Sequence, residues 1–314
     1  MNKEISRIQE EVKKVIVGKD DVISKVLMAI LAQGHILLED VPGVGKTTLA
    51  ASFAKVLGLD TKRVQFTSDT MPSDIIGFSV YDMQSGQLQY KPGAIMTNLL
   101  LADEINRTSS KTQSALLEAM EERQVTVDGN TYVLETPFVV LATQNPIGSA
   151  GTQMLPTAQL DRFLMRLSMG YPDKQSQIEI MKERHHANPI DKVETVVDIP
   201  TLKKLIDEVT NIYVADEIYD YITELAEATR NNQHIQLGVS PRGALAVCRT
   251  AKAAAYINGR DYVTPADVRA VFTDVCAHRI VLSTKARLHE YTAELLFKDL
   301  LEDVKSPEVK ESLI

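Results

Sequence analysis

A lysine and two threonines follow a glycine-bearing loop that begins after the short apolar run at 35–38. Backbone N–H groups in such a loop can surround a phosphate, and the helix expected over 49–57 adds the positive end of its dipole. Lys46 would reach the β- and γ-phosphates of ATP, and the Thr47 hydroxyl would bind Mg²⁺. The pattern therefore predicts a P-loop whose nucleotide-contacting residues are Pro42, Gly43, Val44, Gly45, Lys46, Thr47 and Thr48.

Asp40 stands where the pattern G-x-x-x-x-G-K-[ST] has its first glycine. Aspartate adopts left-handed backbone more readily than most residues, so we expect the turn to survive the change. An ordinary strand-to-helix turn is the alternative for the loop taken alone.

Two acids, Asp103 and Glu104, end the apolar run 98–102. A strand buried in a parallel sheet cannot keep carboxylates inside, so both should emerge at its carboxyl end, where open α/β sheets bind ligands. Asp103 is then placed to bind the metal and Glu104 to polarise the attacking water. Such a pair more often marks a solvated strand end or a helix cap, but the P-loop upstream favours the catalytic reading.

A third apolar strand, 137–144, is followed by Asn145 and Pro146. Asn145 is expected beside Glu104, where it would orient the water that attacks the γ-phosphate. A turn-forming Asn-Pro pair is the alternative, and both readings can hold together.

Arg242 is a cation in an unfavourable place. Ser240 is a good N-cap and Pro241 a good first helical residue, so Arg242 falls in the first turn of a helix, where it opposes the helix dipole. A residue placed against local preference often serves a site. The alternative is an arginine that only faces solvent.

Taken together, these motifs resemble those of AAA+ ATPases of the MoxR group, and the likeness covers almost the whole chain. The matching segments are 39–47 for Walker A, 101–107 for Walker B, 141–146 for sensor 1, 155–163 for the arginine-finger region and 239–242 for sensor 2. The order and spacing of all five are far more specific than the Walker motifs alone.

The resemblance implies a Mg²⁺-dependent ATPase that assembles as a ring, with a hexamer as the expected form. Arg162 matches the arginine that a neighbouring subunit supplies to the γ-phosphate, and Arg166 is the competing candidate. A salt bridge to a helix acid is the plain alternative for Arg162. Arg242 would touch the nucleotide from the lid, and Val17 and Gly18 would line the adenine pocket.

In this family the ring remodels or activates a partner, often a protein with a von Willebrand factor A domain, in chaperone-like maturation or metal insertion. That partner would be a separate polypeptide here. Two other functions stay open: a nucleotide-gated scaffold with little turnover, and a nucleic-acid motor. The intact Glu104 disfavours the first. A net charge of −8, from 42 acids and 34 bases, makes nucleic acid an unlikely partner.

The expected fold class is α/β: a parallel-sheet P-loop NTPase (AAA+) core with a C-terminal all-α lid domain. Alternating strands and helices place the nucleotide-binding domain at 1–170, and helical periodicity places the lid at 171–314. Two hairpin insertions are expected in the first domain, near 79–90 and 124–134, the second with a tight turn at Asp128-Gly129. The resemblance implies that both face a pore or a substrate; plain surface hairpins are the alternative.

Targeting and metal signals are weak. Cys248 and Cys276 lack the spacing of a zinc site or a disulfide framework, so no metal beyond nucleotide-bound Mg²⁺ is implied. The N-terminus has no apolar core of signal-peptide length, and no run approaches a membrane span. We therefore expect a cytoplasmic protein.

Overall fold

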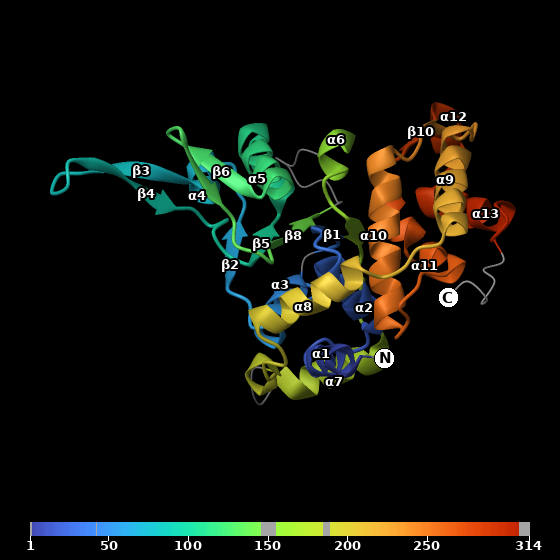
Figure 1. Cartoon of the computed structure of the whole chain (residues 1–314), viewed down its shortest axis with the longest axis horizontal. Helices are drawn as coiled ribbons and strands as arrows, with labels where there is room; N and C mark the ends of the chain where they lie inside the picture. The colour runs from blue at the N-terminus through green and yellow to red at the C-terminus, as the bar shows by residue number, and fades with distance from the viewer. Residues whose placement is uncertain (1, 42, 146–154, 185–188, 308–314) are drawn as a thin grey trace.

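A five-stranded parallel sheet forms the centre of the first unit in the computed structural model, which describes residues 2–41, 43–145, 155–184 and 189–307 (Figure 1). Its strands, in spatial order, are β2 (Thr61–Gln65), β5 (Leu99–Asp103), β8 (Val139–Gln144), β1 (Ile36–Glu39) and β9 (Met165–Leu167). All neighbouring pairs are parallel, so every strand ends at the same edge. The expected sheet is confirmed.

Successive residues of the central strands face two different cores. Leu99 and Leu101 pack into the core formed with α1 (Lys3–Lys13), α2 (Asp20–Leu31) and α3 (Lys46–Val56). Leu100 and Ala102 pack into a second core beneath α5 (Ser110–Glu122). Because both faces of the sheet are covered, the strands read as continuous apolar runs.

Two antiparallel hairpins extend from this unit, as the sequence predicts, and lie on the left of Figure 1. The first follows α4 (Pro72–Ile76) and consists of β3 (Gly77–Asp82) and β4 (Gln87–Pro92); the second consists of β6 (Gln124–Val127) and β7 (Asn130–Val133). Asp128 and Gly129 both have positive φ, 50° and 80°, as the tight turn requires. The Tyr90 ring stacks on Tyr132 with centroids 3.9 Å apart and so joins the hairpins.

The second unit is mainly helical. After the short α6 (Thr157–Leu160), its helices are α7 (Lys174–Arg184), α8 (Ile199–Thr210), α9 (Asp216–Arg230), α10 (Pro241–Ile257), α11 (Pro265–Cys276), α12 (Thr284–Leu288) and α13 (Ala293–Asp303). One apolar face of α9 is buried, and a capping box at the start of α11 joins Thr264 and Asp267. A short antiparallel ladder, β10 (Ile235–Leu237) with β11 (Val281–Leu282), is added to the expected all-helical unit. These strands are too short to show alternation.

The two units share one continuous core, and the chain after the first unit wraps back over α3. The N–H of Val196 donates to the carbonyl oxygen of Val56 at 2.8 Å. Gly58 has φ of 59°, and a Cβ there would lie 3.0 Å from the carbonyl oxygen of Val197. Because the two units share this core, the domain boundary at 170/171 stays a prediction from the sequence pattern.

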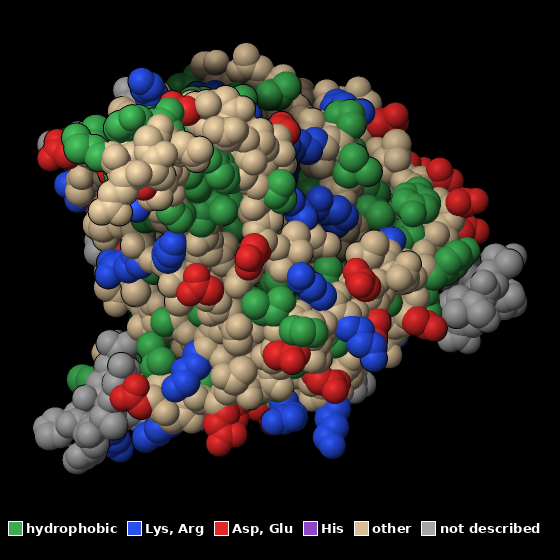
Figure 2. Space-filling view, turned by 60° about the vertical axis from the view of Figure 1, so that its left-hand side comes forward, with side chains coloured by type: hydrophobic (Ala, Val, Ile, Leu, Met, Phe, Trp, Pro, Cys, Tyr) green, Lys and Arg blue, Asp and Glu red, His purple; other side chains and the backbone are tan. Residues whose placement is uncertain are grey.

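The surface has two notable properties. Hydrophobic side chains lie exposed in the upper left of Figure 2, where the hairpin side of the molecule comes forward. Exposed apolar residues on the first hairpin are Phe78, Val80, Tyr81, Met83 and Leu88. None of the described helices combines the length and apolar character needed to cross a membrane.

Candidate functional site

The loop after β1 has the backbone that phosphate binding needs. Gly43 and Gly45 have φ of 87° and 98°, values that favour glycine, and Gly45 caps α3. Lys46 opens the helix and is buried, with its Nζ donating to the carbonyl oxygen of Asp40 at 2.9 Å. Burial lowers the pKa of Lys46, and nearby carboxylates, including Asp103, partly oppose this. Thr47 is exposed in the first turn, and Pro42 lies outside the described residues.

The reason given for tolerating Asp40 is wrong. Asp40 is not among the residues whose positive φ gives a left-handed backbone. The buried carboxylate instead accepts hydrogen bonds from the Ser168 hydroxyl at 2.9 Å and from the N–H groups of Met169 and Gly170, the latter at 3.0 Å. Asp40 therefore ties the start of the P-loop to the segment that follows β9.

The two acids emerge at the carboxyl end of β5, as predicted. Asp103 accepts from the Thr143 hydroxyl at 2.6 Å and from the Arg63 guanidinium at 2.8 Å. Glu104 has left-handed backbone with φ of 58°, and its N–H donates to Thr143 Oγ1 at 2.9 Å. Its carboxylate pairs with Arg107 at 2.8 Å. One buried hydroxyl thus positions both acids.

Asn145 directly follows β8, the strand adjacent to β5. Its carbonyl oxygen accepts from the Asn106 side chain at 3.3 Å. Asn106 lies two residues beyond Glu104, so the structure brings Asn145 next to the acids, as the sequence predicts.

The loop with Val17 and Gly18 meets the same segment that Asp40 holds. Gly18 has φ of 70°, and a Cβ there would lie 2.2 Å from Ser176 Oγ. Lys19 Nζ donates to the carbonyl oxygen of Tyr171 at 2.9 Å. Residues 168–176 therefore connect this loop to the P-loop.

Arg162 and Arg242 lie together. Arg162 donates to the carbonyl oxygen of Leu117 at 2.7 Å and pairs with Glu121 at 3.2 Å, and its side chain is 31% exposed. Arg242, in the first turn of α10 behind the predicted Ser240 cap, pairs with the same Glu121 at 2.9 Å. The helix-acid salt bridge considered for Arg162 is present, and it is shared.

This arginine pair lies at the opposite edge of the sheet from the P-loop. Arg162 shortly precedes β9, whose first residue, Met165, is level with Ile36, the first residue of β1. The N–H of Leu164 donates to the carbonyl oxygen of His35 at 2.7 Å. Because the P-loop follows the other end of β1, the length of a strand separates Arg162 from the phosphate loop of its own chain.

Arg166 is held by acids of its own chain. It lies on β9 and pairs with Glu39 at 3.1 Å and with Glu294 at 2.9 Å. It lies nearer the P-loop than Arg162 does along the direction of the sheet.

Comparisons with known proteins bear on this arrangement. A family model described as "ATPase family associated with various cellular activities (AAA)" matches residues 35–165, and an AAA lid domain model matches 227–299. The uncharacterized protein YeaC of Bacillus subtilis is 46% identical over 96% of this chain and 95% of its own. Chaperone MoxR1 of Mycobacterium tuberculosis is 39% identical over 95% of this chain and 81% of its own.

A solved structure from Cytophaga hutchinsonii, described as a presumed ATPase, has a TM-score of 0.91 and 39% identity, and the match covers 97% of this chain and 95% of that one. This chain belongs to the MoxR group of AAA+ ATPases. The resemblance drawn from the motifs is confirmed.

In this MoxR-type ATPase the lid holds the segment that carries Arg162. Arg279, which is 4% exposed, donates to Asp161 Oδ1 and to the carbonyl oxygen of Phe163, both at 2.7 Å. Its neighbour His278 contacts the same Phe163 carbonyl through Nε2 at 3.0 Å. Movement of the lid would therefore move the arginine.

Sequence reasoning missed Thr143, Arg63, Arg107 and Arg279. Thr143 offered a signal, because a hydroxyl inside an otherwise apolar strand needs a partner. Arg63 and Arg279 offered none, since their partners lie 40 and 118 residues away in the chain. Arg107 is only three residues from Glu104, but an i,i+3 pair of opposite charges is common on solvated surfaces.

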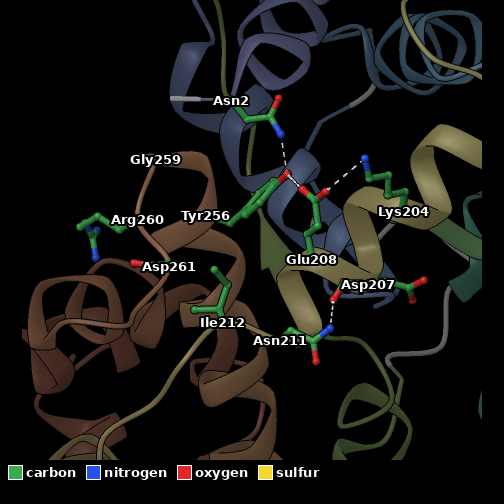
Figure 3. Close-up of a pocket in the computed structure, with 10 residues that line it drawn as sticks. All are labelled: Asn2, Lys204, Asp207, Glu208, Asn211, Ile212, Tyr256, Gly259, Arg260 and Asp261. Carbon is green, nitrogen blue, oxygen red and sulfur yellow. Dashed lines mark hydrogen bonds and ion pairs between the residues drawn. The ribbon is translucent and has the colours of Figure 1, made fainter. Parts of the chain in front are cut away.

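A separate cavity of about 810 Å³ lies between the start of α1, α8 and the α10–α11 turn (Figure 3). Three of the side chains drawn there are joined in a row: Asn2 donates to the Tyr256 hydroxyl at 2.5 Å, and that hydroxyl donates to Glu208. Burial raises the pKa of Tyr256. No described residue of the P-loop is in its lining, and the Asn2, Tyr256 and Glu208 contacts join the start of α1 to α10 and α8.

Proposed function

We propose that this AAA+ ATPase hydrolyses ATP with Mg²⁺ at sites shared between neighbouring protomers of a ring, and that it uses the cycle to remodel a partner protein. The observation that carries the proposal is the split of the machinery. Phosphate loop and acids occupy one edge of the sheet, and the arginine pair occupies the other. A ring that sets one edge against the other would complete each site.

At the carboxyl edge, Lys46 and the loop N–H groups would bind the phosphates. The Thr47 hydroxyl and the Asp103 carboxylate are oxygen ligands of the kind Mg²⁺ prefers, so the residues present fit that ion. When bound, Mg²⁺ would neutralise charge that develops on the β- and γ-phosphate oxygens. Glu104 would take a proton from water, and Asn145 would orient that water.

Val17 and Gly18 would line the adenine pocket. Support comes from their connection to the P-loop through residues 168–176, which bond both Asp40 and Lys19. The segment would let the base-binding loop and the phosphate-binding loop move together.

At the amino edge, Arg162 and Arg242 would stabilise the γ-phosphate of the neighbouring protomer's nucleotide. Both carry partly exposed guanidinium groups and share a single carboxylate, Glu121, so one of them can leave it at small cost. Arg166 is the poorer candidate because two acids of its own chain hold it.

The chaperone-like role follows from relatives such as the chaperone MoxR1. The motif resemblance implies that the remodelled partner would be a separate protein with a von Willebrand factor A domain. The hairpin β3–β4 supports a client-facing role, because its exposed apolar side chains belong to neither core cluster of the described residues. A hexameric ring and a cytoplasmic location belong to the same proposal.

The deciding experiment compares ATP turnover of the parent with that of Glu104→Gln. The substitution keeps size and the Arg107 contact but removes the base, so we expect turnover to fall about 10²–10⁴-fold while ATP still binds. Equal rates would favour a nucleotide-gated scaffold. Turnover that rises on adding DNA or RNA would favour a nucleic-acid motor.

Capture of a client tests the second half of the proposal. Glu104→Gln stalled with ATP should retain a partner protein that Lys46→Ala does not retain, because only the former can reach the ATP-bound state. Equal recovery from both variants would argue against a nucleotide-driven client cycle.

A further inference from the structure

A cavity of about 290 Å³ at the amino edge of the sheet carries more positive charge than it can balance. Its described lining contains five arginines and two acids. The arginines are Arg123, Arg162, Arg242, Arg249 and Arg279, and the acids are Glu121 and Asp161. Three positive charges are thus unmatched, in a chain whose net charge is −8. The excess is a local feature of this cavity.

The two acids are already engaged. Glu121 serves both Arg162 and Arg242, and Asp161 serves Arg279. Neither acid is left for the two other arginines of the cavity.

Among the residues that the structure describes, the Arg123 side chain bonds only to neutral groups. Its guanidinium donates to Gln33 Oε1 at 2.8 Å and to the Gln33 carbonyl oxygen at 3.2 Å. It ends α5 in the left-handed region, with φ of 52°, a position where glycine is usual. The backbone of Arg123, whose side chain brings a positive charge to the cavity, is therefore strained.

Arg249 forms no hydrogen bond or ion pair with any residue that the structure describes. It lies two helical turns beyond Arg242 on the same face of α10, about 10 Å along the axis. Burial of Arg249 and the positive charges of Arg123, Arg279 and Arg242 lower its pKa. Like charges gathered without a counter-charge are costly, so an anion would relieve this site.

We propose that Arg249 and Arg123 form an oxyanion site that binds a phosphate group. A phosphate group brings several acceptor oxygens and more than one negative charge, and guanidinium forks match its geometry. A single carboxylate would balance only one of the three unmatched charges. The phosphate comes either from the neighbouring protomer's nucleotide, which rests on the proposed function, or from a free polyphosphate.

The first arm of the test uses Lys46→Ala, in which the P-loop lysine is gone, and measures binding of tripolyphosphate by calorimetry. We expect saturable binding that weakens at least about tenfold when Arg249→Gln is added, since a charge-assisted contact is lost. Arg7→Gln, the same change at an exposed residue of α1, is the matched control and should leave the affinity unchanged. This arm needs no ATPase activity and stands even if the proposed function fails.

The second arm measures ATP turnover of Arg249→Gln alone and mixed with Lys46→Ala, which carries an intact amino edge. Reduced turnover that the mixture restores assigns the phosphate to the neighbour's nucleotide. Normal turnover together with lost tripolyphosphate binding assigns a free polyphosphate. If tripolyphosphate binding is absent or independent of Arg249 and turnover is unchanged, or if Arg249→Gln only weakens ring assembly, the proposal is overturned.

Discussion

The two edges of the central sheet handle charge in opposite ways. At the carboxyl edge the two acids that follow β5 each pair with an arginine of the same chain: Asp103 pairs with Arg63, and Glu104 pairs with Arg107. At the amino edge arginines outnumber acids, and Arg249 has no partner among the described residues. The charges of these two acids are balanced within one protomer, whereas the excess positive charge at the amino edge favours binding of an anion from outside.

The difference also concerns how easily each edge can change. Arg63 and Arg107 have side chains about half exposed, so their ion pairs are worth little and can give way to nucleotide. Arg279 is buried and multiply bonded, so the segment carrying Arg162 is held firmly. We therefore expect the ion pairs around the nucleotide to exchange easily and the segment that carries Arg162 to stay rigid.

Of the substitutions considered, Arg162→Ala should change ATP turnover the most. Removing the cation that reaches the neighbour's γ-phosphate should lower turnover about 10³-fold, while ATP affinity of the same protomer stays within about twofold, because its own P-loop is intact. Steady-state turnover and nucleotide binding measure the two quantities. Arg7→Ala is the control, and a loss of less than tenfold would remove Arg162 from the site.

Thr143→Val should act on both acids at once. The hydroxyl holds Asp103 and the N–H of Glu104, so its loss should lower turnover about 10- to 100-fold. Thr143→Ser keeps the hydroxyl and should recover most of the activity. Thr126→Val, at an exposed position of β6, is the matched control. Turnover of Thr143→Val equal to that of the parent would show that the acids do not need this hydroxyl.

His35, at the amino edge, should make stability depend on pH. Burial lowers the pKa of His35 to about 4, and its ring bonds the Val140 N–H through Nδ1 and the Met120 carbonyl through Nε2. Between pH 6.5 and 4 the unfolded chain binds a proton that the native state does not, so stability is complete above about 6.5 and falls as the pH drops.

Between pH 6.5 and 5 this contribution is on the order of 2 kcal/mol. Denaturant unfolding of parent and His35→Gln at both pH values isolates it, because the buried His278 is common to both. His289→Gln, an exposed change, should follow the parent. Equal pH dependence of parent and His35→Gln would contradict the assignment.

Arg107→Ala should have the smallest effect. Its exposed ion pair with Glu104 holds the base away from other contacts, so removing it should raise basal turnover by up to about fivefold. Single-turnover hydrolysis is the readout, with Arg287→Ala as control. A tenfold fall would instead mean that Arg107 serves the nucleotide.

Local sequence patterns were enough to predict which residues of the P-loop and of the strand end meet at the carboxyl edge. Gly43, Gly45 and Lys46 specify the phosphate loop within a few residues, and Asp103 and Glu104 had to leave the sheet where they do because carboxylates cannot be buried in it. Asp40 was located correctly but explained wrongly, since its partners at 168–170 lie more than 120 residues away.

The amino edge could not be assembled from sequence. Glu121, Arg162 and Arg242 come from α5, the stretch before β9 and α10, and only packing brings them to one carboxylate. Arg249 gave no local signal, because a charged residue on a helix usually faces solvent. The excess of positive charge arises only when the fold brings these side chains together around one cavity, so the sequence does not reveal it.

The central claim is that each hydrolytic site is divided between two protomers. Lys46→Ala lacks the phosphate grip and Arg162→Ala lacks the donated cation, so each alone should be inactive. Mixed in equal amounts, they should regain roughly a quarter of parental turnover under random assembly, because some interfaces join an intact P-loop to an intact Arg162. A mixture that forms mixed assemblies yet stays as inactive as its components would contradict the account.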